Sequence, residues 1–196
     1  MAIQSVIIEP LLSGGLRLAL EGITVLMVVG AVIVGYFLWP FLTGAGYEPV
    51  PDRILRRMIE LSQPKKGQRV YDLGSGFGRI IIKVAMETGA TCTGVEIDPL
   101  KVWWTKRAIR AKGLGAQVNV VKSNLLDADI SQADFVFVFL WEGIMQKLGK
   151  KALKEMKPGS MIVSYYHRIL GWEPEKEDAK NRIYLYKIPE KVIEGL

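Results

Sequence analysis

One long apolar stretch constrains the architecture of this chain more than any other feature. The stretch from Ile23 to Leu42, ITVLMVVGAVIVGYFLWPFL, contains no charged residue. As a helix it spans roughly 30 Å, which is the thickness of a bilayer core. A cleaved signal sequence would have a basic start and a shorter apolar run, and a helix buried in a soluble core is the other alternative. We therefore predict one transmembrane helix over residues 21–44, preceded by a short tail of residues 1–20.

The basic residues on either side of this stretch predict its orientation. Arg17 is the only Lys or Arg before it, whereas five follow soon after it: Arg53, Arg56, Arg57, Lys65 and Lys66. Loops rich in Lys and Arg stay on the cytoplasmic side of a membrane. The sequence therefore predicts a single-pass membrane protein with residues 47–196 in the cytoplasm.

Composition limits the number of domains and the kinds of site. The chain has 196 residues, of which 49% are hydrophobic, enough for one domain of ordinary size plus an appendage. A single Cys, Cys92, and a single His exclude an intrachain disulfide and a zinc site built from Cys and His. The net charge of +6 is compatible with nucleic acid and equally with anionic lipid headgroups.

Helix and strand patterns alternate through the rest of the chain. After a helix predicted at 52–61, five strands are predicted at 68–73, 91–96, 118–121, 135–140 and 161–165, with helices at 79–88, 100–112 and 143–157. The stretch 182–188 alternates as a late strand that we expect to be antiparallel, and 173–180 is a polar loop. Repeated βαβ units are typical of a parallel sheet covered on both faces. Residues 47–196 are thus predicted to form one α/β, Rossmann-like domain.

The strongest motif lies where the first of these strands meets its helix. It reads VYDLGSGFGR over residues 70–79, and its glycines let the backbone turn sharply beside a ligand. A dinucleotide loop would need glycine at Arg79, whereas the pattern here is D-x-G-x-G-x-G. This pattern resembles the first motif of class I methyltransferases, which use S-adenosylmethionine (SAM). The resemblance implies SAM as the cofactor and these residues as its ligands: Asp72, Gly74, Ser75, Gly76 and Gly78.

Two further polar residues follow neighbouring strands. Glu96 ends the second strand about 20 residues after the loop, where a carboxylate can accept both hydroxyls of a ribose. Asn124, followed by Leu125, comes after the third strand, where the resemblance implies a residue beside adenine. A surface acid at position 96 and an asparagine bonded to its own backbone at 124 are the alternatives.

A narrower resemblance covers residues 47–172. The stretches that carry it are YEPVP at 47–51, RRM at 56–58, the glycine loop, Asn124, FLW at 139–141, and VS at 163–164 through to GW at 171–172. Together they resemble the archaeal protein lysine methyltransferases of broad specificity and their mitochondrial relatives that act on ATP synthase c subunit and the adenine nucleotide translocase. The resemblance implies a protein substrate with an accessible lysine, and it adds Tyr47 to the cofactor ligands. Phe77 is a departure, because the family usually has Asp there.

The residues after the fourth strand are the predicted substrate lip. Trp141 could face a lysine side chain and Glu142 could orient its amine, although Trp141 could equally belong to the core. No Asn/Asp-Pro-Pro-aromatic turn is present, so nucleic-acid bases are not the expected acceptor. His167 could accept the released proton, but a loop histidine without a role is the simpler interpretation.

Other functions fit parts of the same pattern. An anchored methyltransferase of a lipid or quinone is one alternative, and a non-catalytic SAM-binding membrane adaptor is another. RNA modification is a further option that the basic charge favours. On the helix at 100–112, Trp103 and Trp104 are adjacent, so we expect one to pack and the other to contact lipid or neighbouring protein.

Overall fold

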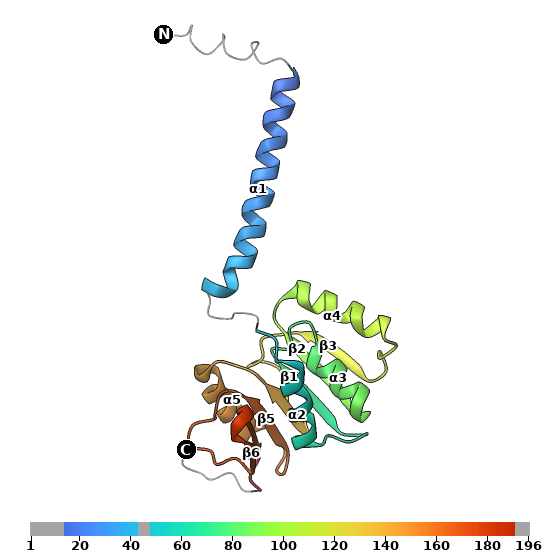
Figure 1. Cartoon of the computed structure of the whole chain (residues 1–196), viewed down its shortest axis with the longest axis vertical. Coiled ribbons are helices and arrows are strands. Elements are labelled where there is room, and N and C mark those ends of the chain that lie inside the picture. Colours follow the sequence, from blue (N-terminus) through green and yellow to red (C-terminus); the bar gives the residue numbers. More distant parts are fainter. Residues whose placement is uncertain (1–13, 43–47, 191–196) are drawn as a thin grey trace. The chain divides into compact units, whose positions relative to one another are not determined.

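The computed structural model describes residues 14–42 and 48–190, and the chain divides into two compact units, Met1–Glu48 and Pro49–Leu196. The first unit contains α1 (Gly14–Leu42) (Figure 1). Within it, the 22 residues Gly15–Tyr36 have a mean hydropathy of 2.3 and none of that window is buried. By length and composition, α1 is able to cross a membrane.

The helix starts earlier than the apolar stretch alone predicts. It begins at Gly14 and so takes in Arg17 and Glu21, which form an ion pair one turn apart at 3.2 Å. Such pairs support a helix beyond its apolar part. The rest of the predicted tail, residues 1–13, lies outside the described residues.

The second unit is built on one seven-stranded sheet (Figure 1). Five strands are parallel: β1 (Arg69–Leu73), β2 (Thr91–Glu96), β3 (Val118–Lys122), β4 (Phe135–Val138) and β5 (Met161–Tyr165). The strand β7 (Ile183–Lys187) is antiparallel to β5, and β6 (Lys176–Asp178) pairs with β7 at the edge of the described sheet. The order is β3-β2-β1-β4-β5-β7-β6, so the direction of winding reverses between β1 and β4. Ligands of open α/β sheets bind at the carboxyl ends of the strands beside such a reversal.

Helices cover both faces of this sheet. Three helices, α2 (Asp52–Ser62), α3 (Arg79–Thr88) and α4 (Pro99–Ala111), contribute apolar residues to one hydrophobic cluster, and α5 (Glu142–Glu155) contributes to a second. The residues of both clusters lie at Val50 or beyond. The second unit therefore has a hydrophobic core of its own.

The predicted alternation of strands and helices is confirmed, as is the late antiparallel strand, but two details are wrong. β4 ends at Val138, so Phe139 and Leu140 leave the sheet. The predicted polar loop 173–180 contains β6 and begins the short 3-10 helix η1 (Ala179–Asn181). β6 has the sequence KED, which lacks an apolar face, and Asp178 instead forms a 2.7 Å ion pair with Arg57 of α2. An edge strand held by a distant arginine leaves no alternating pattern in the sequence.

Candidate active site

The glycine loop between β1 and α3 has the backbone shape that its sequence predicts. Gly74, Gly76 and Gly78 all have positive φ angles, of 84°, 54° and 73°, which residues with a Cβ rarely adopt. The N–H groups of Gly74 and Ser75 both donate to the Val95 carbonyl at 2.9 Å. These bonds fix the loop against the end of β2.

Two glycines also allow close packing around the loop. A Cβ on Gly78 would lie 2.4 Å from Cγ2 of Thr105, and a Cβ on Gly94 of β2 would lie 2.6 Å from Oγ of Ser75. Thr105 is fully buried in α4, and its hydroxyl donates to the Gly76 carbonyl at 3.2 Å. Sequence reasoning missed Thr105, because a lone threonine in a helix gives no sign of a contact 29 residues away.

Glu96 lies where the sequence predicts it, beside the loop. Its side chain is buried, with Oε2 accepting from the Gly76 N–H at 2.8 Å and Oε1 from the Asp98 N–H at 2.9 Å. An ionised carboxylate has about four acceptor positions, so these two bonds leave about two for a ligand. The alternative of a surface acid does not fit this burial.

Asp72 lies on β1 directly before the loop and is buried. Its Oδ2 atom and the Oγ atom of Ser75 have no hydrogen-bond partner among the described residues. Burial, and then the nearby charge of Glu96, raise the pKa of Asp72 to about 8. Buried polar atoms without partners are rare in folded proteins, and here they point to a ligand that donates hydrogen bonds or carries positive charge.

Asn124 follows β3 and holds a turn. Its Oδ1 accepts from the Leu126 N–H at 3.0 Å, the local bond that the alternative interpretation of this residue expects. The amide nitrogen forms no hydrogen bond with any described residue, so it remains available as a donor. The next residue, Leu125, packs against the second hydrophobic cluster.

The predicted substrate lip lies at the carboxyl ends of β4 and β5. Trp141 precedes the first residue of α5, Glu142, and both side chains are exposed, so Trp141 is not a core residue. The Trp141 ring lies 6.3 Å from the His167 ring, centroid to centroid. Leu140 reaches the glycine loop, where Cδ2 lies 3.3 Å from the place of a Cβ on Gly74. The lip and the loop are therefore neighbours.

A strained backbone segment supports this lip. Tyr166 and Arg182 both have positive φ, 73° and 53°, although neither is glycine. The two residues contact each other twice. The Tyr166 N–H donates to the Arg182 carbonyl at 2.8 Å, and the Arg182 guanidinium lies 4.4 Å from the centre of the Tyr166 ring. Such strain of about 1–3 kcal/mol per residue is concentrated at functional sites. Sequence reasoning missed this contact between Tyr166 and Arg182.

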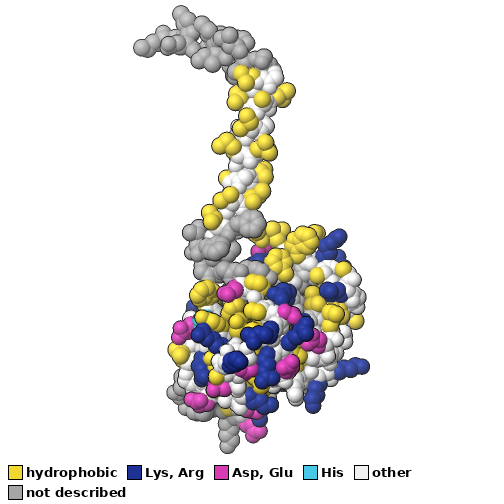
Figure 2. Space-filling model, in the orientation of Figure 1, with side chains coloured by type: hydrophobic (Ala, Val, Ile, Leu, Met, Phe, Trp, Pro, Cys, Tyr) yellow, Lys and Arg dark blue, Asp and Glu magenta, His cyan; other side chains and the backbone are white. Residues whose placement is uncertain are grey.

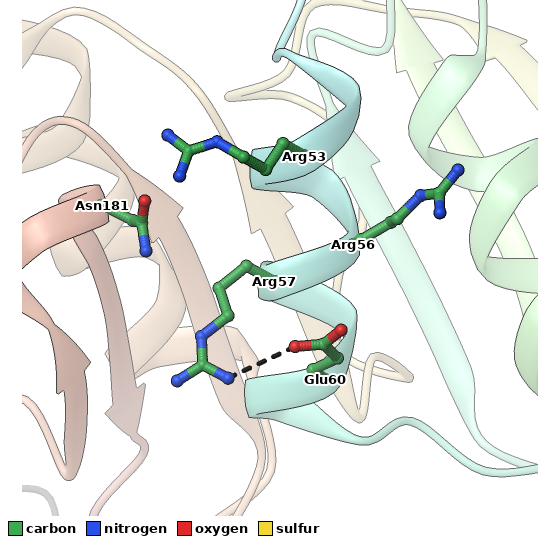
Figure 3. Close-up of a pocket in the computed structure, with 5 residues that line it drawn as sticks. All are labelled: Arg53, Arg56, Arg57, Glu60 and Asn181. Atoms are coloured by element: carbon green, nitrogen blue, oxygen red, sulfur yellow. Dashed lines mark hydrogen bonds and ion pairs between the residues drawn. The ribbon is translucent and has the colours of Figure 1, made fainter.

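Two features lie apart from this region. Tyr47 is outside the described residues. A cavity of about 220 Å³ lies against α2 and η1, away from every predicted site residue, and is lined by Arg53, Arg56, Arg57, Glu60 and Asn181. In Figure 3, Arg56 points away from the other two arginines, and Arg57 bonds to Glu60 at 3.3 Å. Two of the three arginines pair with further acidic residues, Arg56 with Asp52 and Arg57 with Asp178.

Known proteins resemble this chain over the glycine loop and the substrate lip. The family model described as the ANTKMT methyltransferase domain matches residues 72–176. A protein-lysine N-methyltransferase from Saccharolobus islandicus is 36% identical over 151 residues, which cover 74% of this chain and 94% of the relative. A lysine N-methyltransferase of the ATP synthase c subunit, from Rattus norvegicus, is 25% identical over 171 residues, covering 83% of this chain and 78% of the relative.

A solved structure has the same fold. It is an RNA methyltransferase from Salinibacter ruber in complex with S-adenosyl-L-homocysteine. Its TM-score is 0.72 at 33% identity, and the match covers 76% of this chain and 99% of that one. That structure holds S-adenosyl-L-homocysteine, which is SAM without its transferable methyl group, and the names of the similar proteins give different acceptors.

Proposed function

This chain belongs to the ANTKMT methyltransferase family and is a SAM-dependent methyltransferase, and on that premise we propose that it methylates lysine side chains of proteins. The observation that carries the proposal is the 36% identity to a protein-lysine N-methyltransferase of which 94% is covered.

The residues around the glycine loop fit SAM. Bound SAM supplies an electrophilic methyl group on a positively charged sulfur. The unpartnered Oδ2 of Asp72 suits the amino group of its methionine end, and the free acceptor positions of Glu96 suit the two ribose hydroxyls. The backbone of the loop would run close to the ligand at Gly74, Ser75, Gly76 and Gly78. We further propose Asn124 and Leu125 beside adenine, with the Asn124 amide as donor, and Tyr47 as a contact from outside the described residues.

The substrate lip would prepare the lysine. Methyl transfer needs the nucleophile about 3 to 3.5 Å from the methyl carbon and in line with it. Lysine must lose its proton first, and its ordinary pKa is about 10.4, so a water-poor lip is needed to lower it. The exposed indole of Trp141 is suited to cover the lysine side chain, and Glu142 to orient the amine. His167, beside the Trp141 ring, is a candidate to pass the proton to water.

We also propose that α1 anchors the enzyme in a membrane, with the methyltransferase domain on the cytoplasmic side. The support is the length and hydropathy of α1 and the excess of basic residues after it. An anchored enzyme meets acceptor lysines in membrane proteins or in partners near the membrane surface.

A labelling experiment tests the lysine proposal. The full chain is incubated with isotopically labelled SAM and a membrane extract, and the products are mapped by mass spectrometry. We expect label on lysine in protein, and far less label at the same SAM concentration when Glu96→Gln replaces the wild type. Label confined to the lipid extract would refute the proposal and favour the lipid or quinone alternative.

RNA is the second candidate acceptor, because the 33% identical structure is named an RNA methyltransferase. The net charge of +6 is also compatible with RNA. Adding ribonuclease to the same incubation separates the two candidates. If ribonuclease releases the label and the protein carries none, the acceptor is RNA and not lysine.

A further inference from the structure

The beginning of α4 presents large apolar side chains to solvent. Leu100, Trp103 and Trp104 are 51%, 55% and 53% exposed, and Ile97 in the preceding loop is 63% exposed. We call these four residues the α4 patch. The two indole rings pack edge to face, 4.9 Å apart. The expectation that one of the tryptophans packs into the core is therefore wrong.

Helix geometry explains why both tryptophans are outside. α4 buries Val102, Thr105 and Ile109, which follow one another at helical spacing. At 3.6 residues per turn, positions 100, 103 and 104 fall on the opposite side. That side of a surface helix is normally polar. Two tryptophans and a leucine there need a partner that the described residues do not supply.

The next turns of α4 are basic. Lys106, Arg107 and Arg110 are exposed and form no ion pair with any described residue, and the helix contains no acidic residue. Figure 2 shows hydrophobic side chains gathered over the α4 end of the domain with Lys and Arg side chains beside them. The surface thus joins an aromatic edge to uncompensated positive charge.

We propose that the α4 patch docks the methyltransferase domain onto an anionic membrane surface, separately from the anchor α1. Tryptophan prefers the headgroup level of a bilayer, and each nearby Lys or Arg is attracted to anionic lipid. Trp and Arg are also common at protein interfaces, so a protein partner is an outcome that the test below separates. The unpaired basic side chains on the convex side of one helix favour a broad anionic surface.

Docking in this way would bring the cofactor edge of the sheet to the bilayer. α4 begins just after Glu96, with the Asp98 side chain accepting from the Leu100 N–H at 2.9 Å, and Thr105 bonds the glycine loop. A lysine close to the headgroups would then be the nearest acceptor. This consequence rests on the proposed lysine transfer, whereas the docking does not.

A site-specific fluorophore tests the docking in the full chain. Burial, and then the charge of Asp72, raise the pKa of the Cys92 thiol to about 12, so an introduced surface cysteine is labelled selectively. Leu100→Cys carries an environment-sensitive dye and leaves both tryptophans in place. Met86→Cys is the matched control, because Met86 is also apolar and 61% exposed but lies in the last turn of α3.

The labelled chains are reconstituted into phosphatidylcholine vesicles with and without phosphatidylglycerol. With the anionic lipid, we expect doxyl-labelled lipids to quench the dye at position 100 about twofold or more, and to leave position 86 unquenched. Replacing both tryptophans by alanine should abolish the quenching at 100. The dye at Trp104→Cys gives an independent reading if the first variant does not fold.

Three results would overturn the proposal. Equal quenching at positions 100 and 86 would mean that the domain touches lipid without a preferred face. If iodide quenches the dye at position 100 freely in every kind of vesicle, the patch stays in water and does not contact the membrane. A dye shielded from iodide but not quenched by lipid would place a protein, such as a second copy of the chain, on the patch. Lysine methylation can succeed or fail under each of these results, so the two proposals are judged separately.

Discussion

Replacing Asp72 by Asn should change how the stability of the empty enzyme depends on pH. The pKa of Asp72 rises from its ordinary value of 3.8, which we take for the unfolded chain, to about 8 in the folded chain, because the carboxyl is buried and lies near Glu96. Between these values the folded state holds a proton that the unfolded state has released. The stability that this protonation contributes is therefore complete below about pH 4 and is lost as the pH rises through 8.

The size of the effect follows from the shift. Each pKa unit corresponds to about 1.36 kcal/mol, so the two units between pH 6 and pH 8 cost the wild type about 3 kcal/mol. For a domain of this size that is about 10 °C in Tm. An asparagine side chain at position 72 does not titrate, so the Asp72→Asn variant should lack this part of the loss.

Thermal unfolding of the full chain in non-ionic detergent, followed by near-ultraviolet circular dichroism at pH 6, 7.5 and 9, measures the difference. Groups other than Asp72 titrate in both proteins and cancel in the comparison. We expect the variant to gain about 3 kcal/mol relative to the wild type on going from pH 6 to pH 9. Parallel pH profiles would show that Asp72 is not protonated in the empty fold.

The cofactor supplies a second part of the same test. A ligand amino group beside Asp72 favours its charged form and lowers its pKa, so SAM should flatten the wild-type profile. Binding at pH 7 should also release up to about one proton, which calorimetry in buffers of different ionisation enthalpy detects. A wild type that binds SAM without proton release would place the amino group elsewhere.

The remaining predictions concern the loop and the lip. Glu96→Gln should weaken SAM binding about 100-fold in calorimetry, because the amide keeps one accepting oxygen and replaces the other by an NH2 group that donates, and unchanged affinity would exclude Glu96 from the site. Gly78→Ala should cost about 2–4 kcal/mol in thermal unfolding, from the contact with Thr105 and the positive φ, and Thr105→Ser in the same chain should recover the contact part by removing Cγ2. Trp141→Ala should raise the KM for a protein acceptor about tenfold with SAM affinity unchanged, whereas an equal loss of both would assign Trp141 to the fold.

The sequence predicts those parts of the site that a short local pattern defines. The glycine loop is one such part, because positive φ selects glycine at each of three positions, and Glu96 is another, because a parallel strand after the loop ends beside it. The depth of burial of Asp72 and its missing partner are not local properties. They arise from the registration of β1 between β2 and β4, which places Asp72 opposite Gly94 and Phe137.

Contacts between distant segments explain what the sequence did not predict. The Tyr166 and Arg182 pair joins the end of β5 to the start of β7, and neither residue has the small side chain that usually indicates a left-handed backbone. The exposure of both tryptophans on α4 depends on which face of the helix meets the sheet. The spacing of apolar residues identifies the packed face of a helix only when the other face is polar. α4 has apolar residues on both faces, so its sequence does not show which face meets the sheet.

The two acidic side chains at the loop are more easily explained by the bound state than by the empty one. Burial and the charge of Glu96 raise the cost of ionising Asp72, and Asp72 has a buried oxygen that no described group satisfies. Folding alone would favour an apolar or amide residue at position 72. A cationic ligand reverses that preference, because it pairs with the charge that the empty protein excludes. The destabilisation of the empty domain at alkaline pH and the affinity for SAM should therefore fall together when Asp72 is neutralised, as stability and function often oppose each other at a binding site.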